Sequence, residues 1–537
     1  MKKVLAIFMA IVMVATMFSL SVVSFAEGET EKASISKYLG TASEKNLGLM
    51  YDRKLKDVVV DEAQGSLSKP WNLHVFNPAT EITDNKISPV YPTVGTMIID
   101  KVNDYAASGE YSEVNIVLTA SAEVAVMFYG LKGTAESPIV IVSEGTTKKS
   151  FNNTATEAPA ITLVDCEYVT VKNITVSALN NGIVLDGCAN VTIEGVDFSQ
   201  VGYVDYLTPV VDDAGNESIN AMETAALVEK GSSVLVGGDC TDIAVTACTF
   251  TKCRAGVVVD STVVEEETEE DADAPAEASE EVAADAKGVT VVDCQFDGMN
   301  IAAVVAVGGE DIAVSGGSVT KSGDVINADG YDGTSAAAFV LDGAKNVTIE
   351  RVFSTDNTAF IEAYDVTGRV RYNVSDRDGS SFVFADELLV YNNTFVNTTS
   401  LELNAVVKNN IFSLVIGEKV SVGEGEANCY YWTSKGDNKS IRKNPRFANA
   451  YTGAEEGVSV RDNYILATGS PCIGEGVQVE DDMGSVDFYG NAIGSTHNIG
   501  ADEGAGAEAT TEIVSDFVDF FNYIFAVIKN FFANLFA

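Results

Sequence analysis

Several basic and acidic side chains in the second half of the chain are of the types that take part in catalysis or bind cations. Three of them, Lys321, Arg371 and Asp378, are our candidates for a catalytic role. A lyase that acts on a uronic-acid polymer needs a basic side chain to remove the proton beside the sugar carboxylate, and positive charge to neutralise that carboxylate. A glycoside hydrolase instead needs two carboxylates about 5–9.5 Å apart. The sequence contains groups for either reaction.

Two short acidic sequences suggest a cation. Asp329-Gly-Tyr-Asp332-Gly and Asp376-Arg-Asp378-Gly each resemble a fragment of a calcium-binding loop. We therefore predict Ca²⁺ as a cofactor, with Asp329, Asp332 and Asp376 as its ligands. Neither sequence is a complete EF-hand loop, and Asp and Gly are also ordinary turn residues, so turns without a metal are the alternative.

Other site chemistries are poorly represented. His74 and His497 are the only histidines, which disfavours a Ser–His–Asp triad. Trp71 and Trp432 are the only tryptophans that could stack on sugar rings. No Cys-x-x-Cys or Cys/His spacing typical of zinc sites is present.

A repeat of about 22 residues must position these groups. Cys166-Glu-Tyr-Val169-Thr-Val171-Lys-Asn-Ile174-Thr-Val176 returns at Cys188 and again at Cys240, with further copies near Val289, Ile312 and Val347 and weaker ones beyond Val370. Each copy has two short stretches of alternating β-branched residues, separated by Asn, Asp or Gly. One copy cannot bury its apolar face alone, whereas stacked copies share a core. The period predicts a parallel β-helix; a leucine-rich repeat would need regularly spaced Leu.

Stacking predicts where the chemical groups meet. Equivalent positions on successive rungs lie about 4.8 Å apart, so turns that follow the second stretch should form one edge. Charged residues expected along or near it are Lys321, Asp324, Asp329, Asp332, Arg351, Asp356, Arg371, Asp376, Arg377 and Asp378.

The eight cysteines occupy repeat positions. Cys166, Cys188 and Cys240 are equivalent, as are Cys248 and Cys294. A rung spacing of about 4.8 Å is wider than the usual Cβ–Cβ distance in a disulfide, near 3.8 Å. We expect a ladder of buried thiols, with disulfides as the alternative.

The formal charge is −44 at pH 7, which disfavours nucleic acid as a partner and favours cations. Residues 1–26 resemble a signal peptide, with Lys2 and Lys3, an apolar run and Ser24-Phe25-Ala26 before the cleavage site. The long apolar run leaves an uncleaved anchor as the alternative. Either interpretation places the protein outside the cytoplasm, secreted or on the cell surface.

The expected organisation is a signal peptide at 1–26, an N-terminal cap region at 27–114 and a β-helix at 115–503. Insertions interrupt the helix at 202–230, 264–286 and 320–335, and a closing segment lies near 437–503. A linker at 504–511 leads to an amphipathic, Phe-rich tail at 512–537. We expect the tail to contact the membrane or cell envelope; a helix that caps the solenoid or a self-association seam are the alternatives. We expect a monomer.

Three further stretches of the sequence are characteristic: Lys132-Gly-Thr-Ala-Glu-Ser-Pro-Ile-Val-Ile, Val370–Gly379 with Val390–Phe395, and Gly469-Ser-Pro-Cys-Ile through Asn498–Glu503. They resemble the right-handed parallel β-helix superfamily, the pectate-lyase-like group of secreted bacterial proteins. The resemblance implies an all-β, right-handed single-stranded parallel β-helix, to which the sequence adds a short C-terminal amphipathic helix. It also implies a surface protein that binds polysaccharide and, if it is an enzyme, cleaves it as a lyase or glycoside hydrolase. A non-catalytic adhesion or structural protein is the alternative.

Overall fold

The computed structural model describes residues 59–60, 71–75 and 102–508, except for internal gaps. The gaps are 119–120, 122–125, 144, 155–158, 205–209, 212–216, 219–230, 262–284, 325–335, 416–419, 434–435 and 449–459. The expected signal peptide, the tail at 512–537 and most of the three insertions therefore lie outside the described residues. So do the proposed calcium ligands Asp329 and Asp332.

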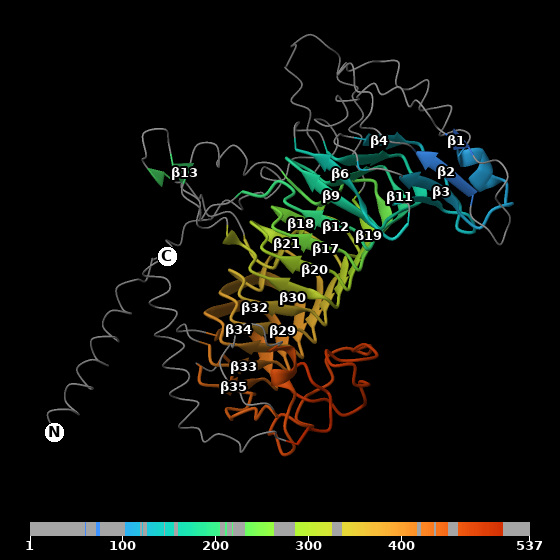
Figure 1. The fold of residues 1–537 in the computed structure, drawn as a ribbon. Coiled ribbons are helices and arrows are strands. Elements are labelled where there is room, and N and C mark those ends of the chain that lie inside the picture. Colours follow the sequence, from blue (N-terminus) through green and yellow to red (C-terminus); the bar gives the residue numbers. More distant parts are fainter. Residues whose placement is uncertain are drawn as a thin grey trace, which may run out of the picture. The chain divides into compact units, whose positions relative to one another are not determined.

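Parallel strands stack rung upon rung in three ladders, which confirms the predicted β-helix (Figure 1). The first ladder contains β4 (Val126–Tyr129), β7 (Ile161–Val164), β10 (Ile183–Asp186), β15 (Val234–Val236), β18 (Ala255–Asp260), β21 (Ala302–Val307), β24 (Phe339–Asp342) and β27 (Ile361–Tyr364). It continues in the first parts of β30 (Ser380–Tyr391), β32 (Ser400–Lys408) and β34 (Val420–Glu426).

The second ladder contains β2 (Trp71–Val75), β3 (Val114–Leu118), β5 (Ile139–Ser143), β8 (Glu167–Lys172), β11 (Ala189–Glu194), β16 (Thr241–Thr246), β19 (Lys287–Val292), β22 (Ala313–Ser315), β25 (Val347–Glu350) and β28 (Gly368–Arg371). It continues in the later parts of β30, β32 and β34. This ladder already includes Trp71–Val75, inside the region expected to form the cap.

The third ladder is an 11-stranded sheet. Its strands are β6 (Lys149–Asn153), β9 (Ile174–Ala178), β12 (Asp197–Ser199), β17 (Thr249–Thr251), β20 (Gln295–Asp297), β23 (Ser318–Thr320), β26 (Phe353–Thr355), β29 (Val374–Asp376), β31 (Thr394–Val396), β33 (Ile411–Ser413) and β35 (Cys429–Tyr431). Other described elements are β1 (Val59–Val60), antiparallel to β2, the antiparallel pair β13 (Val210–Val211) and β14 (Glu217–Ser218), helical residues 102–107 and the 3₁₀ helix η2 (Val460–Tyr464). No helix in the described part of the chain is long and apolar enough to cross a membrane.

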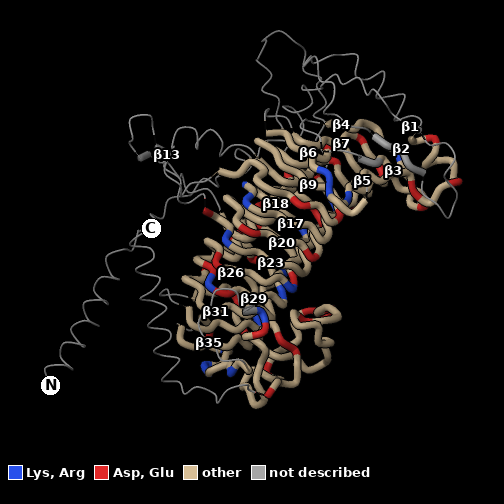
Figure 2. The backbone as a smooth tube through the Cα atoms, in the orientation of Figure 1, with Lys and Arg blue, Asp and Glu red and all other residues tan. Residues whose placement is uncertain are grey.

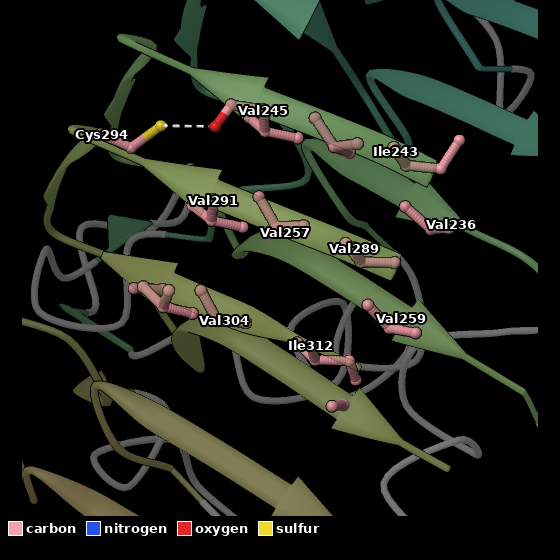
Figure 3. Packing of buried hydrophobic residues seen from close by; sticks show 14 of the residues in the cluster. Val236, Ile243, Val245, Val257, Val259, Val289, Val291, Cys294, Val304 and Ile312 are labelled. Atoms are coloured by element: carbon pink, nitrogen blue, oxygen red, sulfur yellow. Dashed lines mark hydrogen bonds between the residues drawn. The ribbon is translucent and has the colours of Figure 1, made fainter. Parts of the chain in front are cut away.

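The core lies between the ladders. In β16 and β19, Ile243 pairs with Val289 and Val245 with Val291, and all four side chains point inward (Figure 3). Inward positions alternate with partly exposed ones along these strands, as the sequence pattern predicts. All eight cysteines are buried and free, which confirms the expected thiol ladder.

Buried asparagines form a second internal stack at the corner between the second and third ladders. The backbone N–H groups of Asn373, Asn393 and Asn410 each donate to the side-chain oxygen of the asparagine on the next rung, over 2.9–3.0 Å. Their side-chain amides donate to strand carbonyls, such as that of Val370. The stack satisfies backbone groups that the corner would otherwise leave buried without partners.

Candidate functional site

Arg371, at the end of β28, is buried and lies in a network of hydrogen bonds and an ion pair. Its Nε and Nη2 approach Glu350 Oε2 at 2.9 and 2.8 Å, and its Nη1 donates to the Tyr391 hydroxyl and the Asp482 carbonyl, both at 3.1 Å. Burial lowers the pKa of Arg371, but Tyr391 and Glu350 outweigh it and raise the pKa above its ordinary value. An arginine held in its charged form is a poor proton acceptor. The catalytic role of Arg371 stays a prediction.

Asp378 and Asp376 are also buried among partners. Asp378 accepts hydrogen bonds from the Ser354 and Ser375 hydroxyls at 2.6 and 2.7 Å and from the Asn357 backbone N–H at 2.9 Å. Burial raises the pKa of Asp378 to about 6, although these hydrogen-bond donors act to lower it. Asp376 pairs with Arg377 and accepts from Asn397, and burial raises the pKa of its carboxyl as well.

Lys321 follows β23 in a left-handed backbone conformation, and its side chain is exposed. Its positive charge acts on Asp356, which accepts from Arg377 Nε at 2.7 Å. The structure therefore brings Lys321, Asp356, Asp376 and Arg377 together at one corner. Arg371 belongs to a different network, with Glu350 and the closing segment. Acid–base pairs also join successive rungs elsewhere, as between Lys132 and Glu167 and between Lys287 and Glu310. Figure 2 shows the positions of basic and acidic residues along the backbone.

No three or more His, Cys, Asp or Glu side chains among the described residues are placed to hold a metal ion. Asp376 is fully buried beside Arg377, which already neutralises it. Because Asp329 and Asp332 lie outside the described residues, the calcium site stays a prediction.

A second group of residues, absent from the sequence-based candidates, lies on the outer face of the first ladder. We call it the aromatic–acid face. Its members are aligned on four successive rungs and are Asp342, Glu362, Tyr364, Phe382, Phe384, Glu402 and Asn404. Their strand neighbours, such as Ala363 and Val383, point into the core, so these seven side chains point outward.

The aromatic–acid face offers water-accessible apolar and acidic groups side by side. The rings of Tyr364 and Phe384 stack with centroids 5.7 Å apart and planes within 13°, and Phe384 is 40% exposed. Glu362 and Glu402 occupy the same column two rungs apart, a spacing of about 9.6 Å. Such a surface can stack on the apolar side of a sugar ring and accept hydrogen bonds from its hydroxyls.

The sequence contains a pattern that marks this face, but the pattern can be recognised only when the strands of the first ladder are already known. In Glu362-Ala-Tyr364 and Phe382-Val-Phe384, polar or aromatic residues alternate with small or apolar ones. The repeat predicts two strands per copy and does not reveal the first ladder. The earlier strands of that ladder, such as β18 and β21, are buried on both faces and show no alternation.

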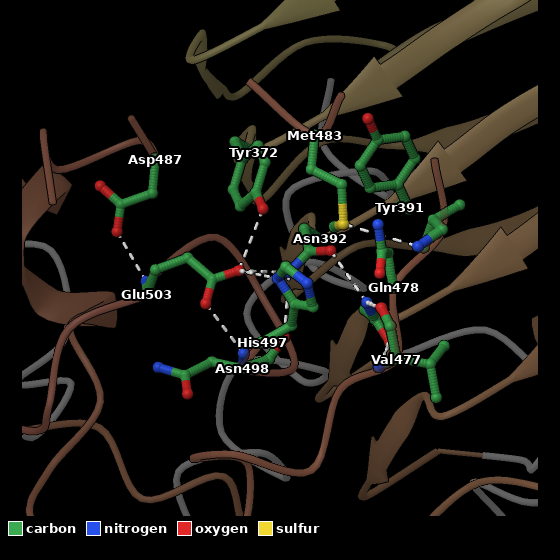
Figure 4. Close-up of polar contacts among 12 residues, drawn as sticks. Tyr372, Tyr391, Asn392, Val477, Gln478, Met483, Asp487, His497, Asn498 and Glu503 are labelled. Atoms are coloured by element: carbon green, nitrogen blue, oxygen red, sulfur yellow. Dashed lines mark hydrogen bonds and ion pairs between the residues drawn. The ribbon is translucent and has the colours of Figure 1, made fainter. Parts of the chain in front are cut away.

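The closing segment forms a third polar cluster, around Glu503. Figure 4 shows the side chains of Tyr372 and Asn392 and the backbone N–H of Asn498 directed at its carboxylate. The carboxylate accepts from the Tyr372 hydroxyl at 3.0 Å, Asn392 Nδ2 at 3.2 Å and the Asn498 N–H at 2.9 Å. Burial raises the pKa of Glu503 to about 7. The Glu503 side chain is only 1% exposed, so this cluster fastens the closing segment to the ladders and does not face a substrate.

No family model matches the chain, and no curated protein matches it in sequence. Among solved structures, it is similar to pectate lyase Pel9A at 12% identity, with a TM-score of 0.43, over 80% of this chain and 95% of that chain. It is similar to an alginate lyase from Paenibacillus sp. str. FPU-7 at 12% identity, with a TM-score of 0.33, over 57% and 92% of the two chains. It is also similar to PfbA, a surface adhesin of Streptococcus pneumoniae, at 12% identity, with a TM-score of 0.36, over 63% and 86%. The parallel β-helix rests on the all-parallel sheets of this chain and not on these likenesses, each of which has a TM-score below 0.5.

Proposed function

We propose that this chain is an exported surface protein that binds a polysaccharide through the aromatic–acid face. The stacked, partly exposed rings of Tyr364 and Phe384, with Glu362 and Glu402 beside them, carry the proposal. Sugar-binding surfaces need an aromatic platform and nearby hydrogen-bond acceptors, and this face has both. The tail at 512–537 is our proposed contact with the cell envelope.

The negative charge of the protein favours neutral glycans or amino sugars as its ligands. The chain carries −44 at pH 7, and the face itself contributes Asp342, Glu362 and Glu402. Uronic-acid polymers such as pectate or alginate would be repelled unless a cation such as Ca²⁺ lay between the two sets of carboxylates. Carboxylates could instead pair with the ammonium groups of an amino sugar.

Binding without cleavage is favoured over a lyase. The lyase hypothesis needs a base and a second positive charge at one water-accessible place. Arg371 is held in its charged form by Glu350 with its side chain only 9% exposed, and the exposed Lys321 lies at a different corner, beside Asp356 and Arg377. Hydrolysis is the second candidate function. The spacing of about 9.6 Å between Glu362 and Glu402 is close to the carboxylate separation of inverting glycosidases.

A panel of neutral, amino-sugar and acidic oligosaccharides, titrated by calorimetry, tests the proposal. Phe384→Ala should weaken binding about tenfold, because a stacking contribution of about 1.4 kcal/mol is lost. Tyr129→Ala is the matched control, since Tyr129 is an exposed aromatic on β4 of the same ladder. Equal affinity of Phe384→Ala and the wild type would contradict the proposed face.

The same panel separates binding from cleavage. A lyase would produce unsaturated sugars with new ultraviolet absorbance, lost in Lys321→Ala and Arg371→Ala. A hydrolase would release reducing ends, and this release would be lost in Glu362→Gln and Glu402→Gln. The proposal expects binding with neither product.

A further inference from the structure

Cys429 points outward from β35, the last strand of the third ladder. Its neighbour Tyr430 points into the main core, and Cys429 pairs with Ile411 on the preceding strand, β33. Ile411 and Cys429 belong to a separate hydrophobic cluster, which also includes Cys472 and Ile499 of the closing segment. The closing segment therefore lies on the outer face of the last two strands of the third ladder.

Backbone contacts hold the closing segment in this place. The Gly500 N–H donates to the Asn409 carbonyl at 2.7 Å. A Cβ at Gly500 would lie 2.5 Å from Ile411 Cδ1, so the segment passes very close to the ladder. The Ile499 N–H donates to the Cys472 carbonyl at 2.9 Å and ties Cys472 to this docked part of the chain.

The thiols of Cys429 and Cys472 meet at this contact, and both residues are fully buried there. The pKa of Cys472 is raised well above its ordinary value, first by the hydrogen bond with the Cys429 thiol and then by burial. The Cys429 thiol also donates to the Lys443 carbonyl at 3.3 Å. Two thiols from separate parts of the chain thus touch where the closing segment meets the ladder.

Cysteines on neighbouring rungs are held differently. Backbone bonds join consecutive rungs directly beside them, from the Ala189 N–H to the Cys166 carbonyl at 2.9 Å and from the Thr241 N–H to the Cys188 carbonyl at 2.8 Å. These bonds keep the rungs about 4.8 Å apart, whereas the Cβ atoms of a disulfide are usually near 3.8 Å apart. The ladder spacing therefore disfavours a disulfide between rungs.

Cys472 is not bound by the ladder spacing. It lies in the turn that follows Ser470, whose hydroxyl accepts from the Cys472 N–H at 3.1 Å. In the part of the chain that the structure describes, the strand pairing of Cys429 is with Ile411 and Ile441. A small shift of the Cys472 turn can therefore bring the two sulfur atoms to bonding distance while every bond between rungs stays in place.

We propose that Cys429 and Cys472 form a disulfide in the exported protein, and that this disulfide fastens the closing segment to the last rung. The end of a solenoid has no further rung to cover it, so a fixed cap protects its exposed edge. The cross-link also closes the long loop between the two residues, and a disulfide stabilises more when its loop is longer. The six remaining cysteines stay thiols.

Oxidation of the pair needs an acceptor for two electrons, and a small disulfide outside the cytoplasm supplies it. One cysteine attacks this oxidant as a thiolate, forms a mixed disulfide and releases the first small thiol. The second cysteine then attacks the mixed disulfide and releases the second small thiol, so the two cysteine protons end on the released thiols. Because both cysteines are fully buried in the folded chain, the exchange takes place before the closing segment docks. The proposal rests on the proposed export for its oxidising surroundings and is independent of polysaccharide binding.

Peptide mapping of the full chain, collected from the medium and digested without reductant, tests the proposal. Trypsin cleaves after Arg446 and Arg461, so only a disulfide can keep the Cys429 and Cys472 peptides together. We expect one cross-linked pair of peptides, and alkylation of the other six cysteines once the protein is unfolded. Alkylation of all eight cysteines would overturn the proposal, as would a disulfide between two cysteines of neighbouring rungs.

Refolding with a mixture of oxidised and reduced glutathione gives a second test that does not depend on export. The melting temperature of the oxidised chain should exceed that of the reduced chain by several degrees. This difference should vanish in Cys472→Ala and remain in Cys253→Ala, which removes the same atoms from another buried position. Equal melting temperatures of the oxidised and reduced wild type, or a difference that persists in Cys472→Ala, would contradict the proposal. Affinity for oligosaccharides should not change on reduction, because the aromatic–acid face lies on the first ladder.

Discussion

At the scale of single residues, the side chains with the most promising chemistry are held by structural partners. Arg371 joins Glu350, Tyr391 and the closing segment, and Asp378 is surrounded by hydroxyl and amide donors. Their residue types and turn positions were visible in the sequence, but their burial was not. Arg371 is covered in part by the closing segment, whose Asp482 is far from Arg371 along the chain, whereas Asp378 is enclosed by Ser354, Asn357 and Ser375.

Arg371→Ala should therefore lower stability. The change leaves Glu350 with Arg351 as its remaining partner and removes the bond to the Asp482 carbonyl, so we expect a loss of about 2–4 kcal/mol in the free energy of unfolding. Lys132→Ala breaks the half-exposed pair with Glu167 and should cost about 0–1 kcal/mol. Urea unfolding measures both. Equal losses in the two variants would show that the Arg371 network adds no stability.

Glu503 predicts an unusual pH dependence. Its pKa is raised from 4.5 to about 7 in the folded state, so the folded protein keeps a proton that the unfolded chain releases. Stability should then fall as the pH rises from about 4.5 to 7, by on the order of 2–3 kcal/mol. Asp378, raised from 3.8 to about 6, acts in the same direction.

Glu503→Gln should reduce this slope, because a neutral side chain releases no proton. Denaturant midpoints at pH 5 and pH 7.5 measure the difference, with Glu167→Gln, an exposed carboxylate, as the control. If the stability of Glu503→Gln depended on pH as strongly as that of the wild type, Glu503 would be ionised in the folded protein throughout this range.

At the scale of elements, the sequence predicted the second and third ladders and missed the first. Alternation is visible in strands such as β11, with one face in the core and one in solvent. It is absent from β18 and β21, which are covered on both sides. The aromatic–acid face was missed for the same reason, since it belongs to the ladder that periodicity did not resolve.

The acidic insertion should be dispensable for stability, because it is highly charged and lacks apolar periodicity. The C-terminal end of the insertion should be needed for stability, because Ala286 is buried and the Ala286 N–H donates to Ser261 Oγ at 3.0 Å. Replacing 264–284 with a short Gly/Ser linker should leave the melting temperature nearly unchanged, whereas Ala286→Asp should lower it by several degrees. A large drop in the linker variant would show that the insertion packs.

Calcium should bind weakly at the sequence Asp329-Gly-Tyr-Asp332, because it offers two carboxylates within four residues. Calorimetry with chelator-treated protein should give a binding heat that is lost in Asp329→Asn and Asp332→Asn. Asp376→Asn should leave this heat in place, because Arg377 already neutralises that buried carboxyl. No heat in the unaltered protein would remove the calcium hypothesis.

At the scale of the whole molecule, the fold provides one long outer face with two different surfaces. The earlier rungs of the first ladder carry five aliphatic side chains that point outward and are nevertheless buried, namely Val184, Leu235, Val258, Val305 and Val340. The later rungs carry the aromatic–acid face, which we assign to a polysaccharide. The repeat predicted the stacking that builds both surfaces, but which positions face outward depends on the register of the first ladder.

Hydroxyl-radical footprinting tests the central claim, that a polysaccharide binds the aromatic–acid face, most directly. Oxidation of Tyr364 and Phe384 would be measured by mass spectrometry with and without a saturating oligosaccharide from the binding panel. We predict that the oligosaccharide protects both rings several-fold and leaves the oxidation of Tyr129, 62% exposed on the same ladder, unchanged. Unchanged oxidation of Tyr364 and Phe384 under saturating conditions, or protection of other aromatic residues instead, would contradict the claim.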